Sequence, residues 1–89
     1  MGDDRLMNVP TRYDEDTEAA QRIARHLAVY MAKHNLTESK LAALLGVNRS
    51  TVNRLLAGER GIGLGLALRV ARRLLIDPHE LLLREPLTK

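Results

Sequence analysis

A single glycine, Gly46, separates two short amphipathic patterns within residues 36–58, and this arrangement constrains the fold more than any other feature. Before Gly46, Thr37 stands where a helix N-cap is expected. The apolar residues that follow it at helical spacing are Leu41, Ala42 and Leu45. Glycine adopts the left-handed conformation that ends many helices at little steric cost. The sequence therefore predicts two helices, over about residues 38–45 and 49–57, joined by a tight turn.

The second of these helices has two chemically different sides. Asn48 stands at its N-cap position. Its inward side is apolar and consists of Val52, Leu55 and Leu56. Its outward side carries hydrogen-bonding side chains, namely Arg49, Ser50, Asn53 and Arg54. Such a helix is suited to contact base edges in the DNA major groove.

A longer helix is expected before this pair. It starts between Asp14 and Thr17, where acidic residues favour a helix N-terminus, and Asn35 takes the left-handed position at its end. Its predicted buried stripe is Ala20, Ile23, Ala24, Leu27, Ala28 and Met31. Tyr30 is interpreted as a packing residue.

Two further helices are expected after residue 58. Four glycines between Gly58 and Gly65 predict a loop, in which Gly63 and Gly65 permit close approach of another helix or of a DNA phosphate. No strand precedes this loop and no lysine follows at Walker spacing, which argues against a nucleotide site. The next helix spans about residues 64–75, with an inward face of Leu64, Leu68, Ala71 and Leu74. An Asp77 cap followed by Pro78 predicts a last helix through about Leu83.

Composition and charge narrow the classes of function. A chain of 89 residues with 2% aromatic residues and no cysteine predicts one leucine-rich domain without disulfides or cysteine-bound zinc. No apolar run approaches the length of a membrane span, and the acidic start does not resemble a signal peptide. Positive charge gathers in residues 36–76, as a phosphate-facing surface requires. For Arg69, Arg72 and Arg73 the alternative is a solvated helix face.

The ordered set of motifs resembles the helix-turn-helix of the lambda-repressor-like (Cro-type, xenobiotic-response-element) family. The resemblance covers about residues 19–83. The matching elements are Leu41-Ala42, Leu45-Gly46-Val47, Ser50-Thr51-Val52, Ala57-Gly58, Val70-Ala71, Leu74 and residues 77–82. It implies an all-α, compact five-helix domain over residues 14–84, with the helix-turn-helix at the second and third helices. Residues 1–13 are then a flexible arm and residues 85–89 a tail.

The resemblance also implies which side chains contact DNA. Bases are contacted by Arg49, Ser50 and Arg54. Asn48 and Asn53 then lie near the phosphates. From its position just past the second helix of the pair, Arg60 is a further candidate phosphate contact. The backbone amides near Ile62 and Gly63 are candidates as well, because a helix N-terminus favours an anion. Thr51 is expected to assist the helix cap. Two acids depart from the family pattern: Glu38 replaces a phosphate-binding glutamine, and Glu59 lies where the loop often has a lysine.

The expected function is a sequence-specific, double-stranded-DNA-binding transcription regulator in the cytoplasm of a bacterium or encoded by a phage. A homodimer is expected through Leu83 and Leu87, or these leucines cover the core edge of a monomer. No catalytic constellation, cofactor or metal site is expected, and His26, His34 and His79 are interpreted as solvent-exposed. The alternatives are an antitoxin, which also binds a toxin protein, and a protein-interaction adaptor that keeps the fold without DNA binding.

Overall fold

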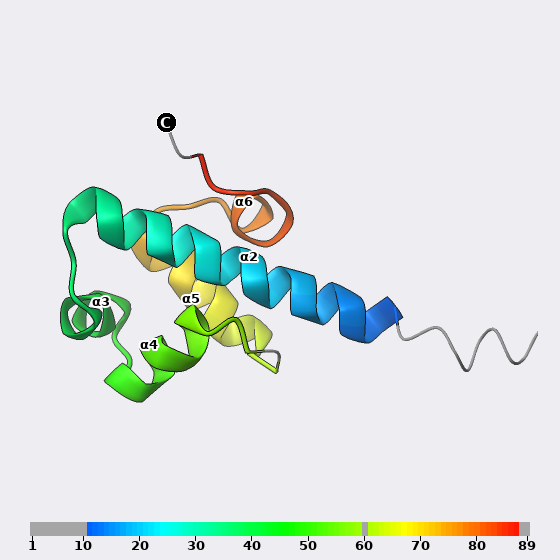
Figure 1. The fold of residues 1–89 in the computed structure, drawn as a ribbon, viewed down its shortest axis with the longest axis horizontal. Helices are drawn as coiled ribbons and strands as arrows, with labels where there is room; N and C mark the ends of the chain where they lie inside the picture. Colours follow the sequence, from blue (N-terminus) through cyan, green and yellow to red (C-terminus); the bar gives the residue numbers. More distant parts are fainter. Residues whose placement is uncertain (1–10, 60, 88–89) are drawn as a thin grey trace, which may run out of the picture.

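A computed structural model describes residues 11–59 and 61–87 of the chain. These residues form helices and connecting loops without strands, which confirms the all-α prediction. The five helices are α2 (Thr11–His34), α3 (Glu38–Leu45), α4 (Arg49–Leu56), α5 (Leu64–Leu74) and α6 (Pro78–Leu83). Helix α2 crosses the molecule, with α6 on one side and α3 and α4 on the other (Figure 1). The helix-turn-helix is formed by α3 and α4, as predicted.

Helix α2 starts earlier than predicted. It begins at Thr11 rather than between Asp14 and Thr17, because no glycine or proline interrupts residues 11–13. Its first turns extend past the other helices (Figure 1). The helix ends at His34, and Asn35 takes the expected left-handed conformation with a φ of 54°.

The side of α2 that faces the core is narrower than predicted. Ala20, Ile23 and Leu27 are buried as expected. Ala28 is exposed, so its assignment to the core was wrong. It follows Leu27 by one position, about 100° around the helix axis, and therefore points away from the packed side.

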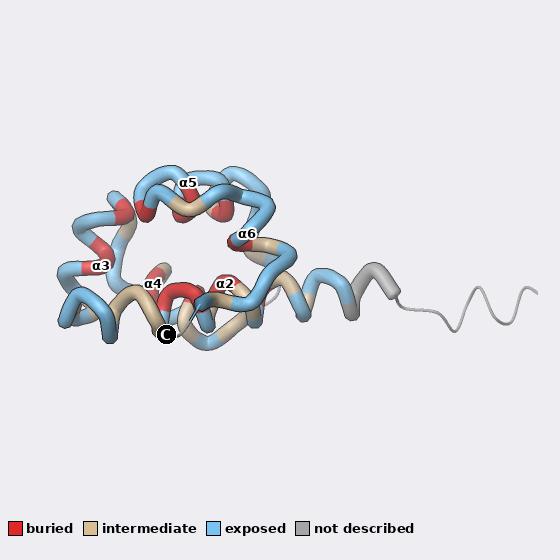
Figure 2. Tube along the Cα trace, turned by 90° about the horizontal axis from the view of Figure 1, so that it is seen from above, coloured by how far each residue is buried: buried red, intermediate tan, exposed pale blue. Residues whose placement is uncertain are grey.

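The core lies between the helices, and the buried residues of α3, α4 and α5 face a shared centre (Figure 2). Helix α5 contributes a stripe at helical spacing, formed by Ala67, Val70, Ala71 and Leu74. The predicted inward positions of Leu64 and Leu68 were wrong, since these side chains are 68% and 38% exposed. Leu64 is the first residue of α5, at the rim, and Leu68 lies beside the buried stripe rather than within it.

The turn between α3 and α4 is held by local and distant contacts. The Thr37 hydroxyl accepts from Lys40 N at 3.1 Å, and Gly46 has a φ of 73°. Helix α3 carries no basic residue in its last turn. Arg73 and Arg69 of α5 supply that charge by donating to Leu44 O at 3.3 Å and Leu45 O at 3.5 Å.

The C-terminal part packs on α2 through a buried histidine. His26 is 8% exposed, so its interpretation as solvent-exposed was wrong. Its Nε2 lies 2.8 Å from Arg84 O and 3.1 Å from Glu80 O. Because both neighbours are acceptors, Nε2 carries the hydrogen and donates. Helix α6 is capped by Asp77, which accepts from His79 N at 2.8 Å.

Candidate nucleic-acid interface

The start of α4 is organised by one side chain. Asn48 Oδ1 accepts from Thr51 N at 2.9 Å, from Thr51 Oγ1 at 2.8 Å and from Ser50 Oγ at 2.8 Å. The predicted cap is therefore present, and Thr51 assists it as expected. The hydrogen bond to the cap holds the Ser50 hydroxyl beside the first turn of α4.

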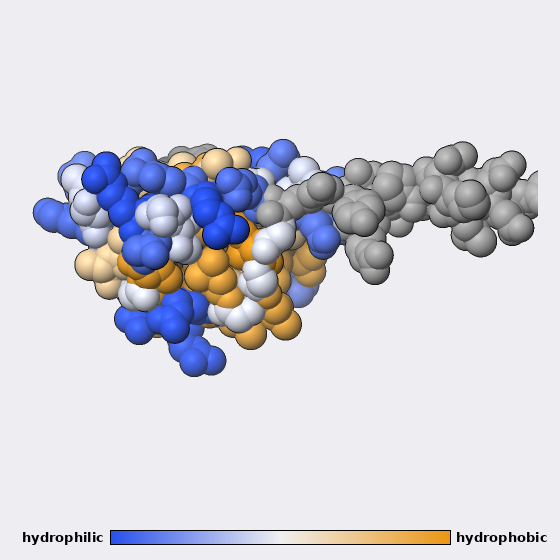
Figure 3. Space-filling model, turned by 90° about the horizontal axis from the view of Figure 1, so that it is seen from below, coloured by the Kyte–Doolittle hydropathy of each residue, from blue (hydrophilic) through white to orange (hydrophobic). Residues whose placement is uncertain are grey.

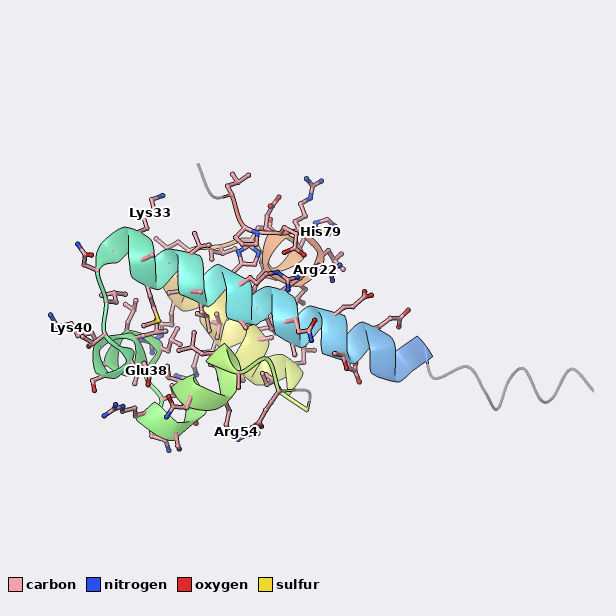
Figure 4. The ribbon with its side chains drawn as sticks, in the orientation of Figure 1. Arg22, Lys33, Glu38, Lys40, Arg54 and His79 are labelled. Atoms are coloured by element: carbon pink, nitrogen blue, oxygen red, sulfur yellow. The ribbon has the colours of Figure 1, made fainter. Side chains whose placement is uncertain are left out.

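The outward side of α4 is open. The four predicted residues on it are all exposed: Arg49, Ser50, Asn53 and Arg54. Arg49 and Arg54 expose 68% and 55% of their side chains, while Val52 and Leu55 on the other side are fully buried. Arg54 projects from the outer side of α4, away from α2 (Figure 4). Seen from the side of α4, hydrophilic residues cover much of the surface around an apolar area (Figure 3).

Both arginines of this side lie next to a carboxylate that belongs to a residue outside α4. Arg49 Nε is 3.8 Å from Glu38 Oε1, at the first position of α3. Arg54 Nε donates to Glu59 Oε1 at 3.1 Å. These are the two acids that depart from the family pattern. Their charge is evident from the sequence, but neither pairing was predicted.

The loop that leads into α5 contains the remaining predicted phosphate contacts. Ile62 is half-buried and packs against the core, and Gly63 is the N-cap residue of α5. Arg60 lies outside the described residues. A Cβ placed on Gly63 or Gly65 would meet no atom of the described residues within 4 Å. Of the two expected alternatives, close approach of another helix is therefore not found among the described residues, and close approach of a DNA phosphate stays a prediction.

The Helix-turn-helix family profile (HTH_3) matches residues 27–81. This range includes α3, α4 and α5, and with them the contacts that Asn48, Arg49 and Arg54 make. The chain belongs to the helix-turn-helix family. No curated protein and no solved structure matches it. As a helix-turn-helix protein with a lambda-repressor-like fold, it is a DNA-binding protein of the regulator class.

The two leucines predicted to form a dimer are exposed but lie in different hollows of this helix-turn-helix protein. Leu83, 60% exposed, borders a hollow with Glu18, Ala19 and Arg22 of α2. Leu87, 87% exposed, borders another with Tyr30 and Leu75. Leu75 is 91% exposed and has a φ of 58°, an uncommon combination that sequence reasoning missed.

The part of the chain that the structure describes contains neither a group of metal ligands nor a helix suited to span a membrane. No group of three or more histidine, aspartate or glutamate side chains there could hold a metal ion. Among the described helices, none combines the length and apolarity needed to cross a bilayer.

Proposed function

We propose that this protein is a sequence-specific transcription regulator that places α4 in the major groove of double-stranded DNA. One observation carries the proposal: four polar side chains of α4 are exposed on one side, while Val52 and Leu55 anchor the other side in the core. A recognition helix needs this division, because base edges are reached only by side chains that protrude from a firmly packed helix.

Each exposed side chain has a role that its chemistry supports. Arg49 and Arg54 can donate two hydrogen bonds to O6 and N7 of guanine, the commonest specific contact in the major groove. Ser50 can contact several bases and therefore discriminates less. The proposed phosphate contacts are Asn48, Asn53, Arg60 and the backbone amides of Ile62 and Gly63.

The experiment is a titration of duplexes against the protein at several salt concentrations, after a selection of preferred sequences from a random pool. The logarithm of the association constant should fall with that of the salt concentration, with a slope of about 0.9 per neutralised phosphate. Arg54→Ala should relax preference at one base pair, and Arg60→Ala should weaken binding to all sequences alike. Lys33→Ala is the matched control and should change neither, because Lys33 is exposed at the end of α2 and points away from α4 (Figure 4).

The ion pairs with Glu38 and Glu59 favour a second candidate, a protein-interaction adaptor. Each places a negative charge beside an arginine that would enter the groove of the negatively charged duplex, which opposes DNA binding. The same titration separates the candidates. An adaptor binds no duplex at low salt, whereas a regulator binds with a steep salt dependence.

We further propose that the regulator acts as a homodimer through Leu83 and Leu87. Two copies would place two recognition helices in successive major grooves about 34 Å apart. Exposed leucines in a small domain favour such a contact. Because the two leucines border different hollows, Leu83→Glu and Leu87→Glu are tested separately by sedimentation equilibrium. Leu64→Glu is the control, since the exposure of Leu64, 68%, lies between those of the two leucines, and Leu64 stands at the start of α5.

A further inference from the structure

Glu59 and Arg54 contact each other twice at the end of α4. The backbone N–H of Glu59 donates to Arg54 O at 3.3 Å, and Arg54 Nε donates to Glu59 Oε1 at 3.1 Å. Gly58 makes this possible, because its φ of 70° turns the chain back over the last turn of the helix. Its own N–H donates to Leu55 O at 3.1 Å, which completes a Schellman motif. The carboxylate of Glu59 is thus placed over Arg54 by the backbone.

The hydrogen bond to Glu59 determines which donors of Arg54 are left. A guanidinium has five N–H groups in a fixed plane. The Nε–H of Arg54 is directed to Glu59, so the two terminal amino groups remain for a base. A long exposed arginine otherwise samples many rotamers, and ordering it on binding opposes complex formation.

We propose that Glu59 is a positioning residue for sequence recognition, which presents the terminal amino groups of Arg54 to a base pair. The inference rests on the proposed DNA-binding function and concerns the sequence preference of that same site. Glu59 must then have opposite effects on the preference for one base pair and on the affinity for duplexes in general. Its contact with Arg54 sharpens the preference for one base pair, while its negative charge near the phosphates lowers affinity for every duplex.

Glu38 provides a matched control for the charge. It also lies beside an arginine of α4, but the gap to Arg49 Nε is 3.8 Å, too long for a hydrogen bond. Glu38 belongs to α3. Its position is therefore not fixed by a backbone hydrogen bond to α4 of the kind that Glu59 makes to Arg54. Glu38→Ala and Glu59→Ala therefore remove the same charge, and only the second also removes a hydrogen bond to an arginine of α4.

The experiment measures dissociation constants for the full protein and its variants with three kinds of duplex. These are the selected sequence, the sequence changed at the base pair where Arg54→Ala loses preference, and a random sequence. Glu59→Ala should bind the random duplex more tightly and lose about threefold or more of the discrimination at that base pair. Glu59→Gln, whose amide oxygen still accepts from Arg54, should keep most of the discrimination. Glu38→Ala should raise affinity for all duplexes and leave the discrimination unchanged.

Three outcomes would overturn the inference. In the first, Glu59→Ala and Glu38→Ala have the same effect on discrimination, which would mean that Glu59 acts through its charge alone. In the second, Glu59→Ala still lowers discrimination in the Arg54→Ala background, which would mean that Glu59 acts through another residue. In the third, the unmodified protein binds no duplex, and the proposed function then fails together with the inference. Thermal unfolding of each variant checks that the fold is retained, as expected for a half-exposed Glu59 side chain.

Discussion

Arg25 and Glu85, sixty residues apart in the chain, form two parallel hydrogen bonds that fasten the segment after α6 to α2. Arg25 Nη2 donates to Glu85 Oε2 at 2.7 Å, and Arg25 Nε donates to the other carboxylate oxygen. Arg22 adds an ion pair, with its Nε 3.3 Å from Glu85 Oε2. The hydrogen bonds from Arg25 hold the pKa of Glu85 below its ordinary value, despite an opposing effect of desolvation.

The lowered pKa predicts an acid-dependent loss of stability. Below its ordinary pKa, Glu85 is protonated in the unfolded chain but still charged in the folded protein, so the folded state is favoured less and less as acid is added. The contribution is complete above the ordinary pKa and is lost as the pH falls through the lowered folded value. Urea unfolding across this pH range should show a gap between the wild type and Glu85→Gln that closes toward low pH. A gap of constant size would contradict the prediction.

His26→Ala should destabilise the protein by about 1–3 kcal/mol, because it removes the buried donor to Arg84 O and leaves a hole beside α6. Chemical denaturation at neutral pH measures the change. His79→Ala is the control, since the side chain of His79 is exposed and its part in the helix cap uses only the backbone N–H. It should change the free energy of unfolding by less than about 0.5 kcal/mol. Equal effects of the two substitutions would show that the His26 contacts do not stabilise the fold.

Two substitutions at Asn48 should separate its structural role from its proposed contact with DNA. Asn48→Ala removes the acceptor of three hydrogen bonds and should destabilise the protein by about 1 kcal/mol. Asn48→Asp keeps the acceptor and adds a negative charge at a helix N-terminus, so stability should be retained. That charge would face phosphates, and duplex binding should therefore weaken. Chemical unfolding and duplex binding of both variants test these two expectations. If Asn48→Asp bound duplexes as tightly as the wild type, Asn48 would not be a DNA contact.

Gly46→Ala should destabilise the protein by about 1–2 kcal/mol, since an alanine at a φ of 73° is strained. Its Cβ would also lie 3.1 Å from Arg69 Nη1, which must then shift. Gly65→Ala is the matched control within α5, where a Cβ has open space and the φ is not left-handed. It should stabilise the protein by about 0.5–1 kcal/mol. Thermal unfolding of the two variants should give shifts of opposite sign.

The helices and their ends were predictable because short-range chemistry sets them. Thr37, Gly46 and Asn48 each act within four residues along the chain, and all three have the predicted role. The start of α2 at Thr11 was missed because several acidic positions could serve equally well near a helix N-terminus. In the candidate site, the outward side chains of α4 were predictable from helical periodicity. Their pairing with Glu38 and Glu59 was not, because it depends on how the chain returns at the turn and after Gly58.

By itself, then, the amino-acid sequence determined the five helices, the turn at Gly46 and the polar side of α4, since all of these follow from local hydrogen bonding and periodicity. Only the tertiary structure decided that Val70 rather than Leu68 enters the core and that His26 is buried. It also decided that Glu85 is fastened to Arg25. The physical reason is that an apolar or ionisable side chain is compatible with either face of its helix. The helices that pack against that side chain come from distant parts of the sequence. They determine whether the side chain is buried or stays in contact with water.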